Sequence, residues 1–300
     1  KPIFLSIGYH FSNDIRYLNE FFCFYKESNH QELWDNCIEK FKENTIEKGA
    51  HIFPLASGED IDKFIKKVLV SVENTESIKE TYDLKVGLLG IPTQFRKSHK
   101  YLLKYFKTEL LFIAYHTSKA VKKFLSLKPV FFLYAILRGT FSYKRLDHKD
   151  GSLVSYLRKN NFDIAFHRLG FIFKEDLINS LSIGIINDHW GLLPFVRGKN
   201  TIEYSIIMGI PLYATTHFIK EEIDTGDLIS LHNYQYLVKD CNSLSEIRKR
   251  IKGKVHDRIN QSVILVAKTK KATVINEKAS GLTYYVMHPY LIEYIEMRLL

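Results

Sequence analysis

The segment IGIINDHWGLLPFVRGKN, residues 183–200, decides the fold. Its apolar start, residues 183–186, predicts a buried strand that runs into Asn187, Asp188 and His189. Residues two apart in an extended segment point the same way, so Asn187 and His189 share one face. Asp188 then points to the other face, where we expect a cap or a surface residue. The loop that follows is punctuated by Trp190, Gly191, Pro194 and Gly198.

Similar short apolar runs recur along the chain, separated by longer amphipathic stretches. This alternation predicts an α/β fold with a mostly parallel, Rossmann-like sheet flanked by helices. Most runs lack polar alternation, as expected of strands that are covered on both faces. The predicted strands are 2–8, 51–55, 84–90, 109–115, 129–136, 162–168 and 183–187, and the predicted helices include 150–159.

The pattern changes after residue 230. Ser243 and Glu246 have the spacing of a capping box. Apolar residues then recur every four positions, at Ile247, Ile251, Val255 and Ile259, which predicts a single helix over 247–266. Short strands are predicted within 272–275 and 282–289, and a terminal helix over 290–300.

The composition is that of an ordinary globular protein, with 46% hydrophobic and 25% charged residues. The longest apolar run, 129–137, is too short to span a bilayer, and no secretory signal is visible. Three cysteines without metal-type spacing favour a reducing compartment. We therefore expect a soluble, cytoplasmic protein with no membrane partner and no metal.

The formal net charge of +10 leaves two interpretations open. One is a Lys-rich solvated surface, and the other is an anionic partner. The basic clusters lack the Gly-aromatic pattern of an RNA-binding sheet, so nucleic acid is not specifically indicated. Only Gly87 and Gly90 stand where a dinucleotide fingerprint needs three glycines, and a Walker loop is missing. These absences argue against NAD and ATP.

Asn187 and His189 are placed to carry chemistry, because open α/β sheets bind ligands at the C-terminal ends of their strands. An Asn-x-His pair alone is common by chance. A second predicted strand, 213–218, leads to Asp224, and this crossover could return a carboxylate to the imidazole. Asn187 and a protonated His189 would donate hydrogen bonds to an oxyanion, while Asp224 would hold the imidazolium and accept the nucleophile's proton. This trio suits attack by a substrate amine on a carbonyl.

The quoted motifs resemble the 10-formyltetrahydrofolate-dependent formyltransferase family. The resemblance rests on INDHWGLLPFVRG, then TTHFIKEEIDTGDLI, in that order. It implies an enzyme with Asn187, His189 and Asp224 as catalytic residues and 10-formyltetrahydrofolate as formyl donor. It also implies pteridine binding, largely through backbone groups, by segments 167–173 and 218–224. The folate-binding residues it predicts are Leu169, Gly170, Phe171, Ile219, Lys220 and Glu222.

Three nearby residues keep open roles. His217 matches the family's Thr-x-His position and either packs behind the site or acts in catalysis. Trp190 stands where the family has a small residue or Pro, and it is either a stacking platform or a lid over the core. Arg197 either shapes its loop or meets an anion. Trp190 and Arg197 are our substrate-binding candidates.

The family's fold places the catalytic Asn at the end of the fifth strand, which makes 84–90 the first strand. We therefore divide the chain into an N-terminal accessory α/β region (1–83), a catalytic domain (84–230) and a C-terminal helix with short strands (231–300). Residues 1–83 could form an accessory domain, extend the sheet or make an oligomer interface, and a homodimer is left open.

The resemblance is strongest to sugar N-formyltransferases that act on dTDP- or GDP-linked 4-amino-4,6-dideoxyhexoses. That substrate implies a part in lipopolysaccharide O-antigen biosynthesis. The alternatives are a methionyl-tRNA or other amine formyltransferase, and a formyltetrahydrofolate hydrolase. Methionyl-tRNA enzymes usually carry a C-terminal β-barrel, for which residues after 230 give little room. A non-enzymatic alternative is a basic nucleotide- or RNA-binding protein on a degraded enzyme scaffold.

Overall fold

The structure is a computed structural model that describes residues 58–73, 81–91, 94–113, 137, 141–146, 151–274 and 282–299. The predicted strands 2–8, 51–55 and 129–136 lie outside these residues.

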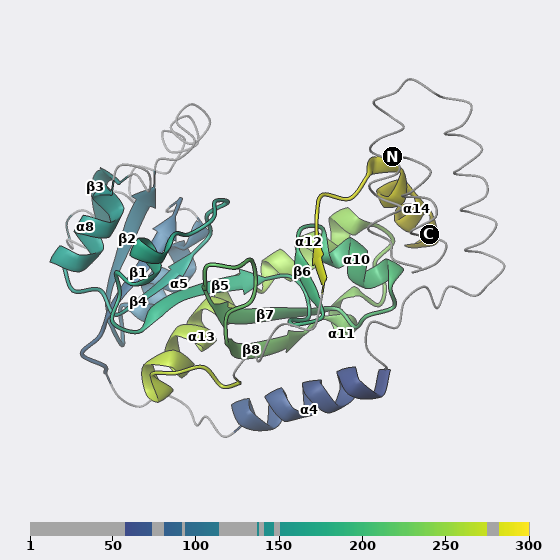
Figure 1. The fold of residues 1–300 in the computed structure, drawn as a ribbon, viewed down its shortest axis with the longest axis horizontal. Helices are drawn as coiled ribbons and strands as arrows, with labels where there is room; N and C mark the ends of the chain where they lie inside the picture. Colours follow the sequence, from purple (N-terminus) through teal and green to yellow (C-terminus); the bar gives the residue numbers. More distant parts are fainter. Residues whose placement is uncertain are drawn as a thin grey trace.

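A seven-stranded sheet forms the centre of the described protein (Figure 1), with strand order β3-β2-β1-β4-β5-β7-β8. The first five strands in this order are parallel, and β7 and β8 are antiparallel to their neighbours. The strands are β1 (Lys85–Gly90), β2 (Lys107–Ile113), β3 (Phe141–Leu146), β4 (Ile164–His167), β5 (Gly184–His189), β7 (Tyr213–Phe218) and β8 (Leu228–Asn233). The predicted α/β fold with a mostly parallel sheet is confirmed.

The bounds of four predicted strands differ from the prediction by one or two residues. The strand expected at 84–90 begins one residue later, and the strand expected at 162–168 spans only 164–167. The strand expected at 109–115 begins two residues earlier, and the strand expected to end at residue 187 continues to His189. The strand β3 was not predicted, because its sequence FSYKRL is mostly polar. It lies at the edge of the sheet, where polar and charged residues are common.

Helices cover both faces of the sheet. On one face, α5 (Arg96–Leu102) and α13 (Val255–Thr269) pack on a core that includes Leu88, Phe166 and Ile186. On the other face, α8 (Ser152–Lys159) and α9 (Glu175–Ile178) pack on a core that includes Leu89, Ala165 and Ile185. Side chains on successive strand positions therefore alternate between two buried layers.

A second cluster of elements lies beyond β5 and β7. It contains α10 (Thr201–Ile207), α11 (Gln235–Val238), α12 (Leu244–Gly253), α14 (Pro289–Leu299) and a two-stranded sheet of β6 (Val196–Gly198) and β9 (Leu282–Tyr284). Ser243 caps α12, as predicted, by accepting a hydrogen bond from the Glu246 amide. The single helix predicted over 247–266 is wrong, because the chain breaks at Lys254 between α12 and α13.

The helix α4 (Gly58–Glu73) runs along the outer side of β8 (Figure 1). Its Ile61, Ile65 and Val68 share a core with Leu192 and Leu193 of the loop after β5. This part of the N-terminal region thus packs directly on the sheet, while the domain boundaries at 83 and 230 stay predictions. Within the described ranges, no helix has both the length and the apolar character needed to cross a membrane.

Candidate active site

Asn187 and His189 lie at the C-terminal end of β5, as the alternation predicted. Ile185, two residues before Asn187, belongs to the core on the α8 and α9 face, so Asn187 and His189 point to that side. Across the sheet, Asn187 pairs with His217 of β7. Two histidines and an amide therefore meet where β5 and β7 run together.

The predicted His189–Asp224 contact is present. His189 Nδ1 lies 3.2 Å from Asp224 Oδ2, and the side chains are 6% and 11% exposed. The other ring nitrogen, Nε2, lies 2.8 Å from the carbonyl oxygen of Val196. Because both nitrogens face acceptor oxygens, a protonated ring satisfies both contacts.

His217 connects the amide to the carboxylate. Its Nε2 lies 3.1 Å from Asn187 Nδ2 and 3.5 Å from Asp224 Oδ1. Its Nδ1 lies 2.8 Å from the carbonyl oxygen of Phe218, which fixes the ring plane. The side chain is 1% exposed. This position favours a role behind the site, in which His217 orients Asn187 and Asp224.

The backbone conformation of Asp224 and a hydrogen bond from Gly198 fix the position of its carboxylate. It has a left-handed φ of 54°, which Asp tolerates better than most residues. Its Oδ2 accepts a hydrogen bond from the Gly198 amide at 2.8 Å. Burial alone would raise the pKa of Asp224, but His189, His217 and the Gly198 amide outweigh burial, so the pKa lies well below its usual range. Asp224 is therefore a carboxylate at neutral pH.

Asp188 points away from this site, as predicted, but it is not a surface residue. Its side chain is 4% exposed and pairs with Arg258 of α13, 1% exposed, through Nε–Oδ1 and Nη2–Oδ2 contacts of 2.5 and 2.7 Å. Arg258 also donates to the Tyr234 hydroxyl and to the carbonyl oxygen of Ile251. The carboxylate between Asn187 and His189 thus anchors the end of β5 to a helix on the opposite face.

The two substrate-binding candidates lie beside the site. Trp190 donates from its indole nitrogen to Asp188 Oδ2 at 3.0 Å and packs against the core around α10. This placement favours the lid over the core rather than a free stacking platform. Arg197 lies half-buried in β6, next to Gly198.

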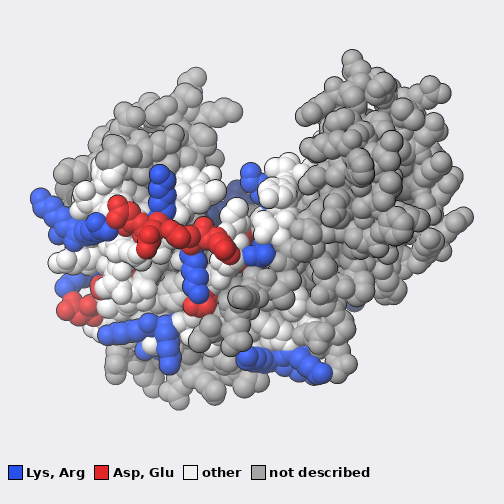
Figure 2. All heavy atoms as spheres, in the orientation of Figure 1, with Lys and Arg blue, Asp and Glu red and all other residues white. Residues whose placement is uncertain are grey.

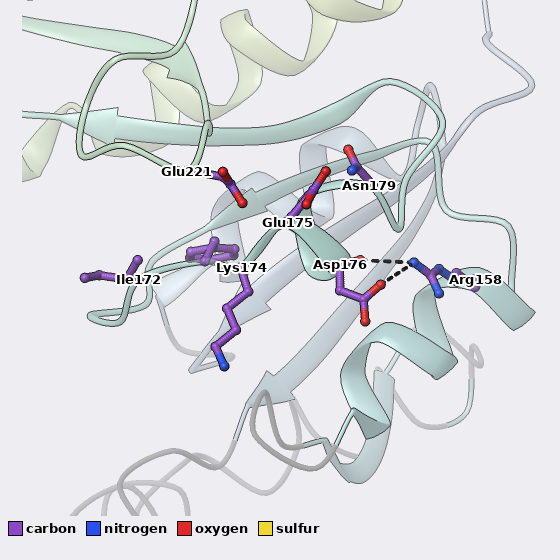
Figure 3. A pocket seen from close by; sticks show the side chains of 8 residues that line it. Arg158, Ile172, Lys174, Glu175, Asp176, Asn179 and Glu221 are labelled. Carbon is purple, nitrogen blue, oxygen red and sulfur yellow. Dashed lines mark hydrogen bonds and ion pairs between the residues drawn. The ribbon is translucent and has the colours of Figure 1, made fainter.

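The predicted folate-binding residues occupy two loops that meet. Leu169 and Phe171, after β4, and Ile219, after β7, pack against the same core, while Gly170, Lys220 and Glu222 are exposed. A cavity of about 630 Å³ opens between these loops (Figure 3). Its lining residues are Arg158, Ile172, Phe173, Lys174, Glu175, Asp176, Asn179 and Glu221.

Two features of this cavity limit what it can hold. None of the catalytic trio lines it. Its three carboxylates outnumber its two cations, and one cation, Arg158, is paired with Asp176 at 2.9 Å (Figure 3). The lining therefore repels a phosphate group.

His167, the last residue of β4, lies in the segment 167–173 that the resemblance assigns to the pteridine, but its side chain was not among the predicted site residues. It is 5% exposed, and its Nδ1 accepts a hydrogen bond from the Leu169 amide at 3.2 Å. Burial lowers the pKa of His167 to about 3, with smaller effects from His217 and Asp224. The sequence pattern could have identified His167. It is a polar residue at the end of a buried apolar run, as Asn187 is in the next strand along the chain.

These groups define a class of enzyme. A buried imidazole–carboxylate pair beside an amide can stabilise an oxyanion and move a proton, which suits acyl transfer to a nucleophile that the substrate brings. In the ranges that the structure covers, no three His, Cys, Asp or Glu side chains are grouped to hold a metal ion.

Comparisons with known proteins agree with this class. The profile of the family described as "Formyl transferase" matches residues 118–263, from the chain before β3 into α13. This part of the chain is therefore similar to a formyltransferase domain. The methionyl-tRNA formyltransferase of Fusobacterium nucleatum is 25% identical over 187 residues, which are 62% of this chain and 59% of that protein. The chain therefore spans less than two thirds of this relative's length.

Two further similar proteins are named for different activities. The mitochondrial formyltetrahydrofolate deformylase 2 of Arabidopsis thaliana is 46% identical over 46 residues, which are 15% of this chain and 14% of that protein. Among solved structures, a sugar N-formyltransferase from a Shewanella species superposes with a TM-score of 0.52 at 16% identity, over 72% of this chain and 87% of that one. At this identity the superposition supports the fold alone.

Proposed function

We propose that the protein transfers the formyl group of 10-formyltetrahydrofolate to the amine of a nucleotide-linked amino sugar. The observation that carries the proposal is the buried His189–Asp224 contact of 3.2 Å beside Asn187, at the ligand-binding end of a parallel sheet.

The chemistry follows from these side chains. The substrate amine attacks the formyl carbon and forms the new C–N bond, and Asn187 donates to the resulting oxyanion. Asp224 takes the proton from the amine, directly or through water. Collapse breaks the bond between the formyl carbon and N10 of the folate, and His189 supplies the proton for the departing nitrogen. Because Val196 occupies His189 Nε2, that nitrogen reaches the intermediate only by exchanging this contact.

One observation bears on the acceptor. The fold is like that of a sugar N-formyltransferase, which favours a small-molecule amine. The face in Figure 2 carries a band of acidic side chains among Lys and Arg, so it does not offer a uniformly basic surface to RNA.

Methionyl-tRNA remains the second candidate acceptor, since the Fusobacterium relative acts, by name, on that substrate. Hydrolysis of the folate remains a third reaction because of the short, high-identity match to a deformylase. The cytoplasmic location, the homodimer and the part in O-antigen synthesis stay predictions.

A screen separates these reactions. The purified protein is mixed with 10-formyltetrahydrofolate and dTDP- or GDP-linked 4-amino-4,6-dideoxyhexoses, glycinamide ribonucleotide or methionyl-tRNA, and each acceptor is weighed by mass spectrometry. We expect a gain of one formyl group on an amino sugar. Gain only on methionyl-tRNA would replace the sugar proposal, and formate release without any amine would indicate a hydrolase.

The trio is tested in the same assay. Asn187→Ala and His189→Ala should each lower turnover by about 100-fold or more, the usual cost of losing one oxyanion donor or acid–base group. Near-normal turnover by His189→Ala would contradict the proposed mechanism.

A further inference from the structure

His167 shares a row of the sheet with the catalytic amide. Ala165 of β4 pairs with Ile185 of β5, and both belong to the core on the α8 and α9 face. Two residues further along each strand, His167 and Asn187 point to that same side. Adjacent strands lie about 4.8 Å apart, so His167 flanks Asn187 on one side as His217 does on the other.

The hydrogen bond to Leu169 sets the tautomer of His167. An amide N–H only donates, so Nδ1 is the acceptor nitrogen and the proton of the neutral ring is on Nε2. This Nε2 is buried, and no acceptor contacts it among the residues that the structure describes. A buried donor without an acceptor carries an uncompensated desolvation cost. The site therefore holds one donor whose acceptor comes from elsewhere.

His167 acts as a neutral donor, not as a cation. Burial lowers its pKa to about 3, so the ring is uncharged across the physiological range. The nitrogens of His189, in contrast, are both engaged, by Val196 and Asp224.

The ring surroundings suit a flat heterocycle. Phe173 packs on the His167 ring with centroids 4.5 Å apart, and Phe171 stacks on Phe173 at 4.9 Å. Phe173 also lines the 630 Å³ cavity between the two predicted folate loops. A folate bound in this cavity would contact Phe173, whose ring packs on that of His167.

We propose that His167 binds the folate by donating its Nε2 hydrogen to an acceptor atom, either a pteridine oxygen or nitrogen or the formyl oxygen. The proposal rests on the proposed use of 10-formyltetrahydrofolate. It adds a side-chain donor to a pocket that the sequence resemblance described as binding largely through backbone groups.

Nitrogen-15 NMR of histidine-labelled protein tests the contact without any turnover. The His167 signals are assigned with His167→Gln, and the protein is titrated with tetrahydrofolate and, separately, with 10-formyltetrahydrofolate. A shift of Nε2 with both ligands identifies a pteridine acceptor, and a shift with the formylated ligand alone identifies the formyl oxygen. Binding of both ligands with no shift overturns the proposal and leaves the proposed function intact. Failure to bind either ligand refutes both.

Matched variants measure how much the His167 hydrogen bond contributes to the affinity for 10-formyltetrahydrofolate. His167→Phe keeps a ring against Phe173 but removes the donor, and we expect the dissociation constant for 10-formyltetrahydrofolate to rise about 10-fold, the loss of one hydrogen bond. His167→Gln places an amide N–H near the same point and should recover most of the affinity. His99→Phe, at a fully buried histidine of α5, is the control for a ring exchange in the core. Wild-type affinity in a folded His167→Phe would overturn the proposal.

Discussion

At the scale of single residues, Asp224 combines a rare backbone conformation with a buried charge. Asn tolerates a left-handed φ as well as Asp does and has nearly the same shape, so Asp224→Asn removes the charge and leaves the loop in place. We expect turnover to fall about 100-fold, because the imidazolium loses its counter-charge and the amine loses its base. Steady-state kinetics measures this, and a rate within twofold of wild type would contradict the role of Asp224.

His217 tests whether orientation matters separately from chemistry. His217→Phe keeps a ring in β7 but loses the contacts to Asn187 and Asp224. A misplaced amide should lower kcat by up to about 100-fold while KM for the folate changes little. A change in KM alone would instead place His217 in substrate binding.

Gly226 allows the chain that carries Asp224 to pass close to the backbone of β7. A Cβ on Gly226 would lie 1.5 Å from the carbonyl oxygen of Phe218, so Gly226→Ala must displace the chain between β7 and β8 that carries Asp224. We expect this variant to lose both thermal stability and turnover. Gly253→Ala is the control. Nothing lies within 4 Å of a Cβ built on Gly253, and alanine has a higher helix propensity than glycine at this last residue of α12. Equal melting temperatures for the two variants would contradict the prediction.

The residues of the site differ in how well they could be predicted from the sequence. The alternation of side chains along a strand predicted that Asn187 and His189 share one face. The number of residues between His189 and Asp224 allowed the prediction that the chain returns to the site. Asp188 was misjudged because its partner, Arg258, comes from a helix 70 residues later, which no local pattern reveals. Val196 and Gly198 act through backbone atoms. Because every residue has these atoms, the residue type does not reveal such a role.

At the scale of elements, the Asp188–Arg258 pair joins β5 to α13. Arg258→Ala leaves a carboxylate buried without its partner, so we expect the free energy of unfolding to fall by about 3–5 kcal/mol. The double variant Asp188→Asn/Arg258→Leu removes both charges and should lose less than Arg258→Ala alone. Urea denaturation measures both, and a double variant less stable than the single one would contradict the argument.

Element boundaries were predictable only where the pattern is local. The four-residue stripe from Ile247 to Ile259 is buried throughout, yet it belongs to two helices. The break at Lys254 keeps the stripe facing the core, so periodicity alone cannot detect it. The edge position of β3 likewise follows from its place beside β2, not from its polar sequence.

At the scale of the whole molecule, buried histidines link stability to pH. Burial lowers the pKa of His99 to about 4, of His167 to about 3 and of His232 to about 4. In the unfolded chain each would titrate near its ordinary pKa of about 6.5. Between these values the unfolded state binds more protons than the folded state, so stability falls as the pH falls.

We therefore expect the free energy of unfolding to drop by roughly 2 kcal/mol for each of these histidines between pH 7 and pH 5. Asp224 contributes in a separate range, because its lowered pKa means that its stabilisation is lost only below about pH 4, where the unfolded carboxyl begins to bind protons. Urea denaturation at pH 7, 6 and 5 measures the slope. His99→Gln, away from the site, should reduce it by about one of these increments, and equal stability at pH 7 and pH 5 would show that the rings are protonated in the folded protein.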